Sequence, residues 1–297
     1  MPPRHRDPVA VVPAASIPAA ERLARLAALA GRVFDGRPRP AAWLADRARR
    51  GCVDWDASVV AVTTGGATPV LCGFGLVGRP PSVAPVARAA GMGVLPTARG
   101  RGLGRRLVRH MLAGAAAAGA TVLEVTAHPT RAAFYERLGF HRTGAMETWC
   151  TTLRGGRGAW READAPWADE ALAPAATDLE ETWSRGRGPR SWVWGDGPSR
   201  IVAHTIEVAG GALTVRVAAA PGADLVTALA ALPGAARARA LFVTGVPPRG
   251  PARRALARAG FRLVERGERL RAPAEPLGTA RTREMAFPLD NDRSPGR

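Results

Sequence analysis

Hydrophobic residues recur at helical and strand-like intervals along the first half of the chain. Leu23, Leu26, Leu29 and Val33 repeat every three or four residues, which predicts one face of a helix that ends near Phe34. Segments rich in β-branched residues and bounded by Gly or Pro predict strands, and the order of the elements predicts a mixed α/β domain. The expected strands are Val9–Val12, Ser58–Thr63, Val70–Val77, Val86–Leu95, Thr121–Thr126 and Glu147–Leu153, and the other expected helices are Ala41–Arg50, Gly102–Ala116 and Thr130–Leu138.

The second half repeats this order more weakly. Phe140 ends an Arg-Leu-Gly-Phe segment and Phe261 ends an Arg-Ala-Gly-Phe segment, and each follows a Val-Thr pair by a similar interval. We therefore interpret residues 154–297 as a divergent second copy of the domain in residues 1–153. Its matching strand and helix are expected at Leu213–Val217 and Leu225–Leu232, after a glycine-rich linker over Leu153–Gly158.

Composition excludes several kinds of chemistry. All 42 basic residues are Arg, so no lysine is present for a Walker-type phosphate loop, a pyridoxal Schiff base or a kinase-type site. Tyr135 is the single tyrosine, so a mechanism that needs a phenol has one candidate. The formal charge of +17 is weak evidence for a nucleic-acid partner, because arginine-rich and alanine-rich composition is typical of a high-GC genome and Phe and Tyr are not interleaved with the arginines.

Cysteine and histidine are too scattered to form a disulfide framework or a metal site. Cys52, Cys72 and Cys150 lie far apart without a Cys-x-x-Cys pair, which fits a reducing cytoplasm. The N-terminus lacks the apolar stretch of a signal peptide, and the longest apolar run, Met111–Leu123, is too short to span a bilayer. We expect a cytoplasmic protein, a monomer or homodimer, without a metal and without a membrane partner.

A glycine-rich turn joins a strand to a helix over Met92–Arg106. Glycines let backbone N–H groups approach a phosphate, and a helix N-terminus adds unpaired donors and a partial positive charge. The segment predicts a pyrophosphate cradle, although such a turn is also typical of an ordinary loop-to-helix transition. It is not the dinucleotide fingerprint, which would need Gly at Arg105. The residues of the cradle are Arg99, Gly100, Arg101, Gly102, Leu103, Gly104 and Arg105.

A second motif, Phe134-Tyr135-x-x-x-Gly139-Phe140, follows the next strand. Together with Arg99-x-x-Gly102-x-Gly104 it resembles the GNAT superfamily of N-acetyltransferases, in which the first motif binds the pyrophosphate of acetyl-CoA and the second holds a phenol. The two motifs that carry the resemblance lie within residues 92–140. Over residues 9–153 the order of the expected helices and strands also agrees with that of the family. It implies an α/β (α+β) fold with a mixed, mostly antiparallel sheet flanked by helices, present as two tandem lobes.

The resemblance also implies roles for individual residues. Met92, Gly93 and Val94 would form the strand that pairs with the pantetheine arm, and a backbone N–H near Val94 would stabilise the oxyanion. Tyr135 would be the general acid that protonates the departing thiolate. Glu124 and His128 are the candidate general bases. Glu124 is equally consistent with a carboxylate paired to a neighbouring Arg, and His128 with a cap on the helix at Thr130.

The second copy lacks the counterparts of the tyrosine and of the glycine-rich turn. Leu256 stands where Tyr135 stands, and Asp224 follows a segment that has no Arg and one Gly. We therefore expect one acetyl-CoA site, in residues 1–153, with residues 154–297 structural or helping to shape the acceptor pocket. Six tryptophans are expected to pack at the lobe junction or, as the alternative, to line that pocket: Trp149, Trp160, Trp167, Trp183, Trp192 and Trp194.

The function implied is acetyl-CoA-dependent transfer of an acetyl group to a primary amine of a small molecule, such as an antibiotic or a secondary metabolite, by direct attack in a ternary complex. Residues 1–153 carry 20 Arg against 9 acidic residues, which disfavours a polycationic acceptor and suits a neutral or anionic amine. A non-catalytic acyl-CoA-binding regulator and a basic nucleic-acid binder remain the alternatives.

Overall fold

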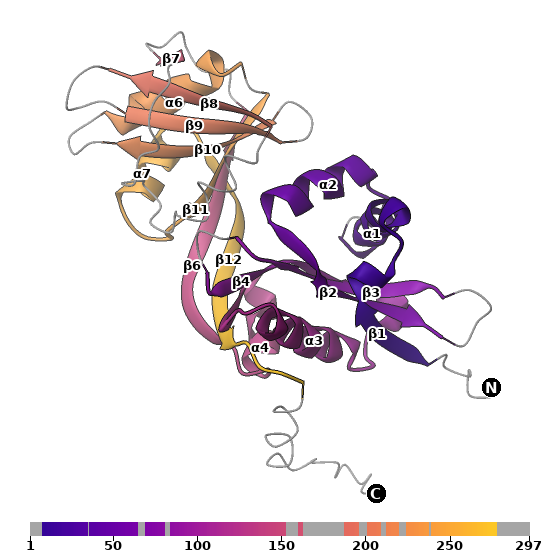
Figure 1. Ribbon diagram of the computed structural model, residues 1–297. Coiled ribbons are helices and arrows are strands. Elements are labelled where there is room, and N and C mark those ends of the chain that lie inside the picture. The colour runs from indigo at the N-terminus through magenta and orange to yellow at the C-terminus, as the bar shows by residue number, and fades with distance from the viewer. Residues whose placement is uncertain are drawn as a thin grey trace, which may run out of the picture.

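Two lobes share a single sheet in the structure, a computed structural model (Figure 1). The structure describes residues 8–34, 36–64, 69–80, 84–152, 160–162, 187–195, 201–208, 212–219, 224–237 and 239–277. The predicted linker over Leu153–Gly158 therefore lies outside the described residues.

The elements alternate as the hydrophobic pattern predicts for the first half. In chain order they are β1 (Val9–Pro13), α1 (Ala19–Phe34), α2 (Ala41–Arg50), β2 (Val53–Thr63), β3 (Leu71–Gly78), β4 (Val86–Val94), α3 (Leu103–Ala117), β5 (Val122–Ala127), α4 (Pro129–Glu136) and β6 (His141–Thr151). The second half continues with β7 (Trp160–Glu162), β8 (Arg187–Trp194), β9 (Ile201–Val208), β10 (Ala212–Ala219), α6 (Leu225–Ala235), β11 (Ala240–Val246), α7 (Pro251–Arg258) and β12 (Arg262–Pro273). Short 3₁₀ turns occur at Ala14–Ser16 and Pro96–Ala98.

The two lobes exchange their last strands. The order of the described strands is β1-β2-β3-β4-β5-β12-β6-β11-β10-β9-β8-β7. The C-terminal strand β12 therefore lies between β5 and β6, and β6 continues into the second half of the sheet by pairing with β11. We call β1–β5 with α1–α4 and β12 the N-terminal lobe, and β7–β11 with α6, α7 and β6 the C-terminal lobe.

The described sheet is mixed and mostly antiparallel, which confirms the predicted fold class. Two pairs are parallel, β4 with β5 and β10 with β11, and they occupy equivalent places in the two lobes. The expected boundary at residue 153 stays a prediction, but strands cross it in both directions, since Leu270 is buried in the N-terminal core and Trp149 in the C-terminal core.

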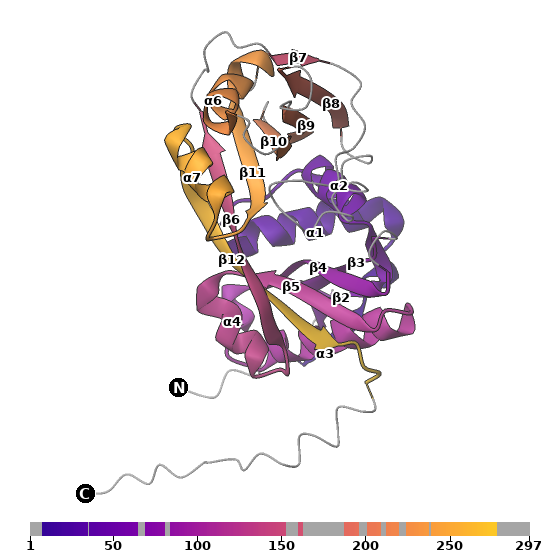
Figure 2. The same cartoon turned by 90° about the vertical axis from the view of Figure 1, so that its left-hand side faces the viewer.

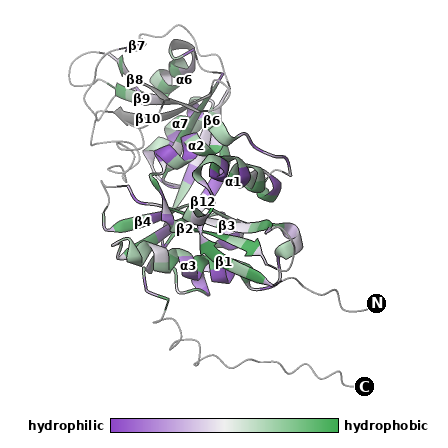
Figure 3. Ribbon diagram, turned by 45° about the vertical axis from the view of Figure 1, so that its right-hand side comes forward, coloured by the Kyte–Doolittle hydropathy of each residue, from purple (hydrophilic) through white to green (hydrophobic). Residues whose placement is uncertain are grey.

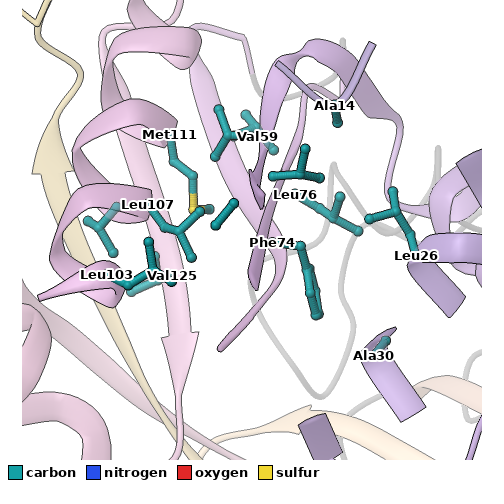
Figure 4. Packing of buried hydrophobic residues seen from close by; sticks show 14 of the residues in the cluster. Ala14, Leu26, Ala30, Val59, Phe74, Leu76, Leu103, Leu107, Met111 and Val125 are labelled. Atoms are coloured by element: carbon teal, nitrogen blue, oxygen red, sulfur yellow. The ribbon is translucent and has the colours of Figure 1, made fainter. Parts of the chain in front are cut away.

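Helices cover both faces of the sheet in the N-terminal lobe. α1 and α2 lie on one face and α3 and α4 on the other, as the two views agree (Figures 1 and 2). The strands of this lobe are mostly hydrophobic, whereas α2 carries many hydrophilic positions (Figure 3). Figure 4 shows Leu26 of α1 against one side of the central strands and Met111 of α3 against the other.

Glycine lets α3 lie close to the central strands. A Cβ placed on Gly75 of β3 would lie 2.5 Å from Sδ of Met111, and a Cβ on Gly114 of α3 would meet the backbone of Ala57. Both distances are far below van der Waals contact, so a larger residue would push the helix away from the sheet. This close packing fixes the helix whose N-terminus forms the predicted cradle.

Candidate active site

The parallel strands β4 and β5 pair only at their first residues. The register joins Val86–Arg88 to Val122–Glu124. Beyond this point β4 is paired with β3 as far as Val94, and β5 is paired with β12 as far as Ala127. The two strands therefore diverge from a vertex at Arg88 and Glu124 and open toward their carboxyl ends.

The backbone of the expected pantetheine strand faces this opening. Leu95 N–H donates to the carbonyl of Cys72 on β3, at 2.9 Å. Successive residues of a strand direct their backbone groups to opposite sides, so Met92 and Val94 direct theirs away from β3 and into the opening. Nε of Arg99 donates to the Val94 carbonyl at 3.0 Å.

Gly93 sits between them for a steric reason. A Cβ at Gly93 would lie 2.5 Å from Cγ1 of Val33, so only glycine lets α1 pack against this strand. Gly91, with φ +152°, lies at an irregularity in the β3–β4 pairing, closer to the vertex. The glycines of this segment therefore shape the strand itself.

The glycine-rich turn leaves the N-terminus of α3 open. Gly100 and Gly102 have φ of +75° and +68°, and a Cβ on either would meet nothing within 4 Å. Gly102 is the N-cap and forms no side-chain cap. The first-turn N–H groups of a helix need partners, so this terminus suits an anion that can reach it.

The arginines near this helix terminus differ in their surroundings. Arg99, Arg101 and Arg105 are exposed, whereas Nη1 of Arg106 donates to the Val9 carbonyl on β1 at 3.0 Å. Leu103 is buried and anchors the first turn of α3 in the core. The cradle residues expected from the sequence are thus contiguous over the glycine-rich turn and the first residues of α3, where the arginines are exposed and Leu103 is buried.

Tyr135 lies on α4 in an aromatic pocket. Its ring packs edge-on against Phe134 and Phe140, at centroid distances of 5.0 and 5.5 Å. A Cβ placed on Gly104 would lie 3.4 Å from Cζ of Phe134, so α4 lies beside the start of α3. Burial raises the pKa of Tyr135 to about 12, so the phenol keeps its proton at any working pH.

This elevated pKa can be measured directly, because Tyr135 is the only tyrosine. The phenolate absorbance near 295 nm should titrate with a midpoint of about 12 in the native protein and about 10 in the denatured chain. Since burial favours the neutral form, the stability that this shift contributes is present below about pH 10 and is lost as the pH rises through about 12. A native midpoint at or below 10 would contradict the buried position.

Glu124 is enclosed by arginines at the vertex. It is 4% exposed, and its Oε2 accepts a hydrogen bond from Nε of Arg271 at 2.8 Å. Nε of Arg88 and Nε of Arg269 lie 3.4 and 3.7 Å from its Oε1. Both carboxylate oxygens thus lie against arginines, and the geometry favours the paired-carboxylate interpretation.

Sequence reasoning did not single out these arginines as partners of Glu124. Arg269 and Arg271 belong to β12, and both follow Glu124 by more than 140 residues in the chain. The only signal in the sequence was the alternation Arg269-Leu270-Arg271, which places two cations on one face of a strand.

His128 caps α4. Its Nδ1 accepts from the Thr130 N–H at 3.3 Å and lies 2.8 Å from Oγ1 of Thr130. The side chain is exposed at the end of β5, where the opening is widest. The capping alternative is thus what the structure displays, and Nε2 is the ring nitrogen outside the cap.

A known family model matches part of the N-terminal lobe. Residues 56–142, from β2 to the start of β6, match the family model for the acetyltransferase (GNAT) domain. This match shows a GNAT domain over residues 56–142. A search of curated proteins finds no match to this chain.

Solved structures share the fold of this chain over both lobes. One is a tandem GNAT protein from the clavulanic acid biosynthesis pathway, with 18% identity, a TM-score of 0.58, and coverage of 91% of this chain and 99% of that chain. Another is a GCN5-related N-acetyltransferase from Sphaerobacter thermophilus, with 15% identity, a TM-score of 0.67, and coverage of 90% and 96%. At these identities the likeness establishes the fold, including its two-lobe layout.

The second GNAT-like lobe repeats the framework and changes its key residues. Phe140 N–H donates to the Tyr135 carbonyl at 3.2 Å, and Phe261 N–H donates to the Leu256 carbonyl at 3.0 Å, so Leu256 is the counterpart of Tyr135. Before α6, Asp224 Oδ1 accepts from the Thr227 N–H at 3.1 Å. A carboxylate of the chain itself therefore caps the helix whose counterpart in the N-terminal lobe is capped by Gly102.

The described tryptophans of the second half are packing residues. Trp149, Trp160 and Trp192 are buried in the C-terminal core, and Trp160 packs against Trp194 at 5.7 Å between ring centroids. Nε1 of Trp160 donates to the Ala228 carbonyl at 2.7 Å. These four residues support the packing interpretation, although within the C-terminal core rather than at the lobe junction; Trp167 and Trp183 lie outside the described residues.

Neither a metal site nor a membrane span is found in the part of the chain that the structure describes. In that part no group of three or more His, Cys, Asp or Glu side chains is arranged to hold a metal ion. None of its helices combines the length and the apolar character that crossing a membrane requires.

Proposed function

We propose that the protein transfers an acetyl group from acetyl-CoA to a primary amine of a small molecule, by direct attack in a ternary complex at the N-terminal lobe. The observation that carries this proposal is the combination, in one lobe, of diverging strands, an open glycine-capped helix and a buried phenol. GNAT proteins as a family use acetyl-CoA. In the C-terminal lobe the phenol is replaced by Leu256 and the helix is capped by Asp224.

Each part of acetyl-CoA can be assigned to residues between β4 and the start of α3. The open turn at Gly100 and Gly102, with Arg99, Arg101 and Arg105 around it, would hold the pyrophosphate. The backbone of Met92 and Val94 would pair with the pantetheine arm, as an added strand pairs with a free sheet edge. The Val94 N–H is our candidate donor to the carbonyl oxygen of the thioester.

Acetyl-CoA supplies a thioester whose carbonyl carbon an amine can attack and whose thiolate then leaves. The nitrogen–carbon bond forms, the carbon–sulfur bond breaks, and the amine loses one proton. Tyr135 would give its phenolic proton to the departing sulfur. We assign acceptance of the amine proton to Nε2 of His128, directly or through water, because the oxygens of Glu124 are engaged by arginines.

Substitution of the cradle glycine tests this proposal. Gly102→Glu puts a carboxylate at an anion site and a side chain at φ +68°, so we expect the affinity for acetyl-CoA to fall at least tenfold in an equilibrium titration. Acetyl transfer to an amine panel, followed by released thiol, should fall with it.

The matched control is Gly119→Glu. Gly119 has φ +85° and open space around its Cβ position, but it lies beyond the C-terminus of α3. This variant carries a similar backbone strain and the same charge and should bind acetyl-CoA like the wild type. Equal affinities in the two variants would rule out a cradle at Gly102.

A further inference from the structure

Phe34, the last residue of α1, presents an aromatic ring to solvent. Its exposed fraction is 55%, and its ring packs edge-on against Phe74 of β3, with 6.1 Å between the ring centroids and 86° between the ring planes. Phe74 itself is buried. We call these two residues the aromatic ledge, and Phe34 is the part of the ledge that another molecule can cover. Covering an exposed apolar ring releases water and is favourable.

Glycines on β4 bring the aromatic ledge to the strand expected to bind pantetheine. Phe74 and Gly93 are cross-strand partners. A Cβ placed on Gly93 would lie 3.1 Å from Cε1 of Phe74, and a Cβ placed on Gly91 would lie 3.7 Å from Cε2. The ring of Phe74 therefore lies over both glycines. Their neighbours Met92 and Val94 direct backbone groups into the opening between β4 and β5.

The aromatic ledge and Tyr135 lie on opposite faces of the sheet. Phe74 lies on the side of the central strands that also carries Leu26 and Ala30 of α1, whereas Met111 of α3 lies on the other side (Figure 4). Tyr135 belongs to α4, which covers the same face as α3 (Figures 1 and 2). An acceptor that enters from the α1 face therefore meets the aromatic ledge, and its amine reaches the thioester from the side away from the phenol.

We infer that the acceptor is an amine joined by a short linker to an aryl ring, and that Phe34 binds this ring and thereby determines specificity. This inference rests on the proposed function and deepens it by naming the class of acceptor. A third ring can pack against the exposed side of Phe34 in the edge-on or offset geometry that aromatic rings prefer. An acceptor without an apolar group would leave Phe34 in water.

The distance to be spanned suits a small molecule. Phe34 packs against Phe74, and Phe74 packs over Gly93, which directly precedes the residue assigned to the thioester, Val94. One aromatic side chain thus separates Phe34 from the strand that holds the reacting carbonyl. A ring in contact with Phe34 therefore needs only a few bonds between itself and the attacking nitrogen.

Matched amines test this inference on the full-length protein with acetyl-CoA. Benzylamine, phenylethylamine and phenylpropylamine are compared with aminoalcohols of the same linker lengths, and released thiol is followed. We expect kcat/KM to be about tenfold higher or more for the best phenyl amine than for its matched aminoalcohol. Phe34→Ser should lower kcat/KM for that phenyl amine about 10–100-fold, mainly through KM, and should leave the aminoalcohols unchanged.

Two control variants separate ring binding from folding. Phe34→Trp keeps an aromatic surface and should keep most of the preference for phenyl amines. Leu277→Ser removes another exposed hydrophobic residue, with an exposed fraction of 50%, and should leave the preference unchanged. Leu277 follows β12 near the start of β5, where the Ala274 N–H donates to the Thr121 carbonyl, so it lies at the end of β5 away from the opening.

Binding can also be compared without turnover. The N-acetylated phenyl amines and aminoalcohols are titrated into the protein with CoA, and the affinity should follow the same order as kcat/KM. Phe34→Ser should weaken binding of the phenyl compounds and should leave the melting temperature nearly unchanged, because more than half of the side chain is already in water.

The outcomes distinguish this inference from the proposed function. If acetyl-CoA does not bind, the proposed function fails. If acetyl-CoA binds but phenyl amines are neither acetylated nor bound better than aminoalcohols, the aryl site alone is overturned. A preference for phenyl amines that survives Phe34→Ser would also overturn it. So would a variant that changes only the oligomeric state, because the aromatic ledge would then be a contact between copies of the chain.

Discussion

Tyr135→Phe is expected to lower kcat for acetyl transfer by about 10²–10⁴-fold, because removal of a positioned general acid has a cost of this size. This corresponds to about 2.7–5.5 kcal/mol of activation free energy. The ring stays between Phe134 and Phe140, so the affinity for acetyl-CoA should change little. Steady-state kinetics and an equilibrium titration on the same preparation measure both quantities.

A packing variant serves as the control for this prediction. Phe140→Leu disturbs the aromatic pocket of Tyr135 but keeps the phenol, so it should lower the melting temperature and reduce kcat far less. The chain offers no second tyrosine to substitute for the first. Wild-type kcat in Tyr135→Phe would remove the phenol from the mechanism.

The N-terminal half, residues 1–153, is expected not to fold into a binding-competent domain by itself. Its sheet is completed by β12, which pairs with β5 and β6 and buries Leu270 completely. Loss of one such buried leucine costs about 2–5 kcal/mol, a large part of the roughly 5–15 kcal/mol that stabilises a domain. Glu124 would also lose Arg269 and Arg271 and remain buried with Arg88 alone.

Thermal unfolding and acetyl-CoA titration of this fragment test the strand exchange. The fragment should show no cooperative transition and no binding at concentrations that saturate the full chain. Co-expression with residues 154–297 supplies β12 in trans and should restore both. A fragment that unfolds cooperatively and binds acetyl-CoA alone would show that β12 is dispensable to the N-terminal lobe.

Local patterns in the sequence sufficed to predict most of the N-terminal lobe. Helical spacing predicted α1, and Gly100 with Gly102 predicted the open turn before α3, because these signals depend on neighbouring residues. The exchange of β6 and β12 depends on pairing between segments more than 100 residues apart. No periodicity within either strand specifies its partner.

The role of Glu124 was undecidable from the sequence for the same reason. A buried carboxylate on a strand fits either a base or an ion pair until its neighbours are known, and two of them lie on β12. Tyr135 was easier to identify, because its motif and the cradle lie in adjacent segments of the chain.

The central claim is that the N-terminal lobe alone holds an acetyl-CoA site, and a calorimetric titration of the full chain tests it most directly. We expect one acetyl-CoA per chain, because Gly102 leaves one helix terminus open while Asp224 caps its counterpart. Two molecules per chain, or no binding at all, would contradict it.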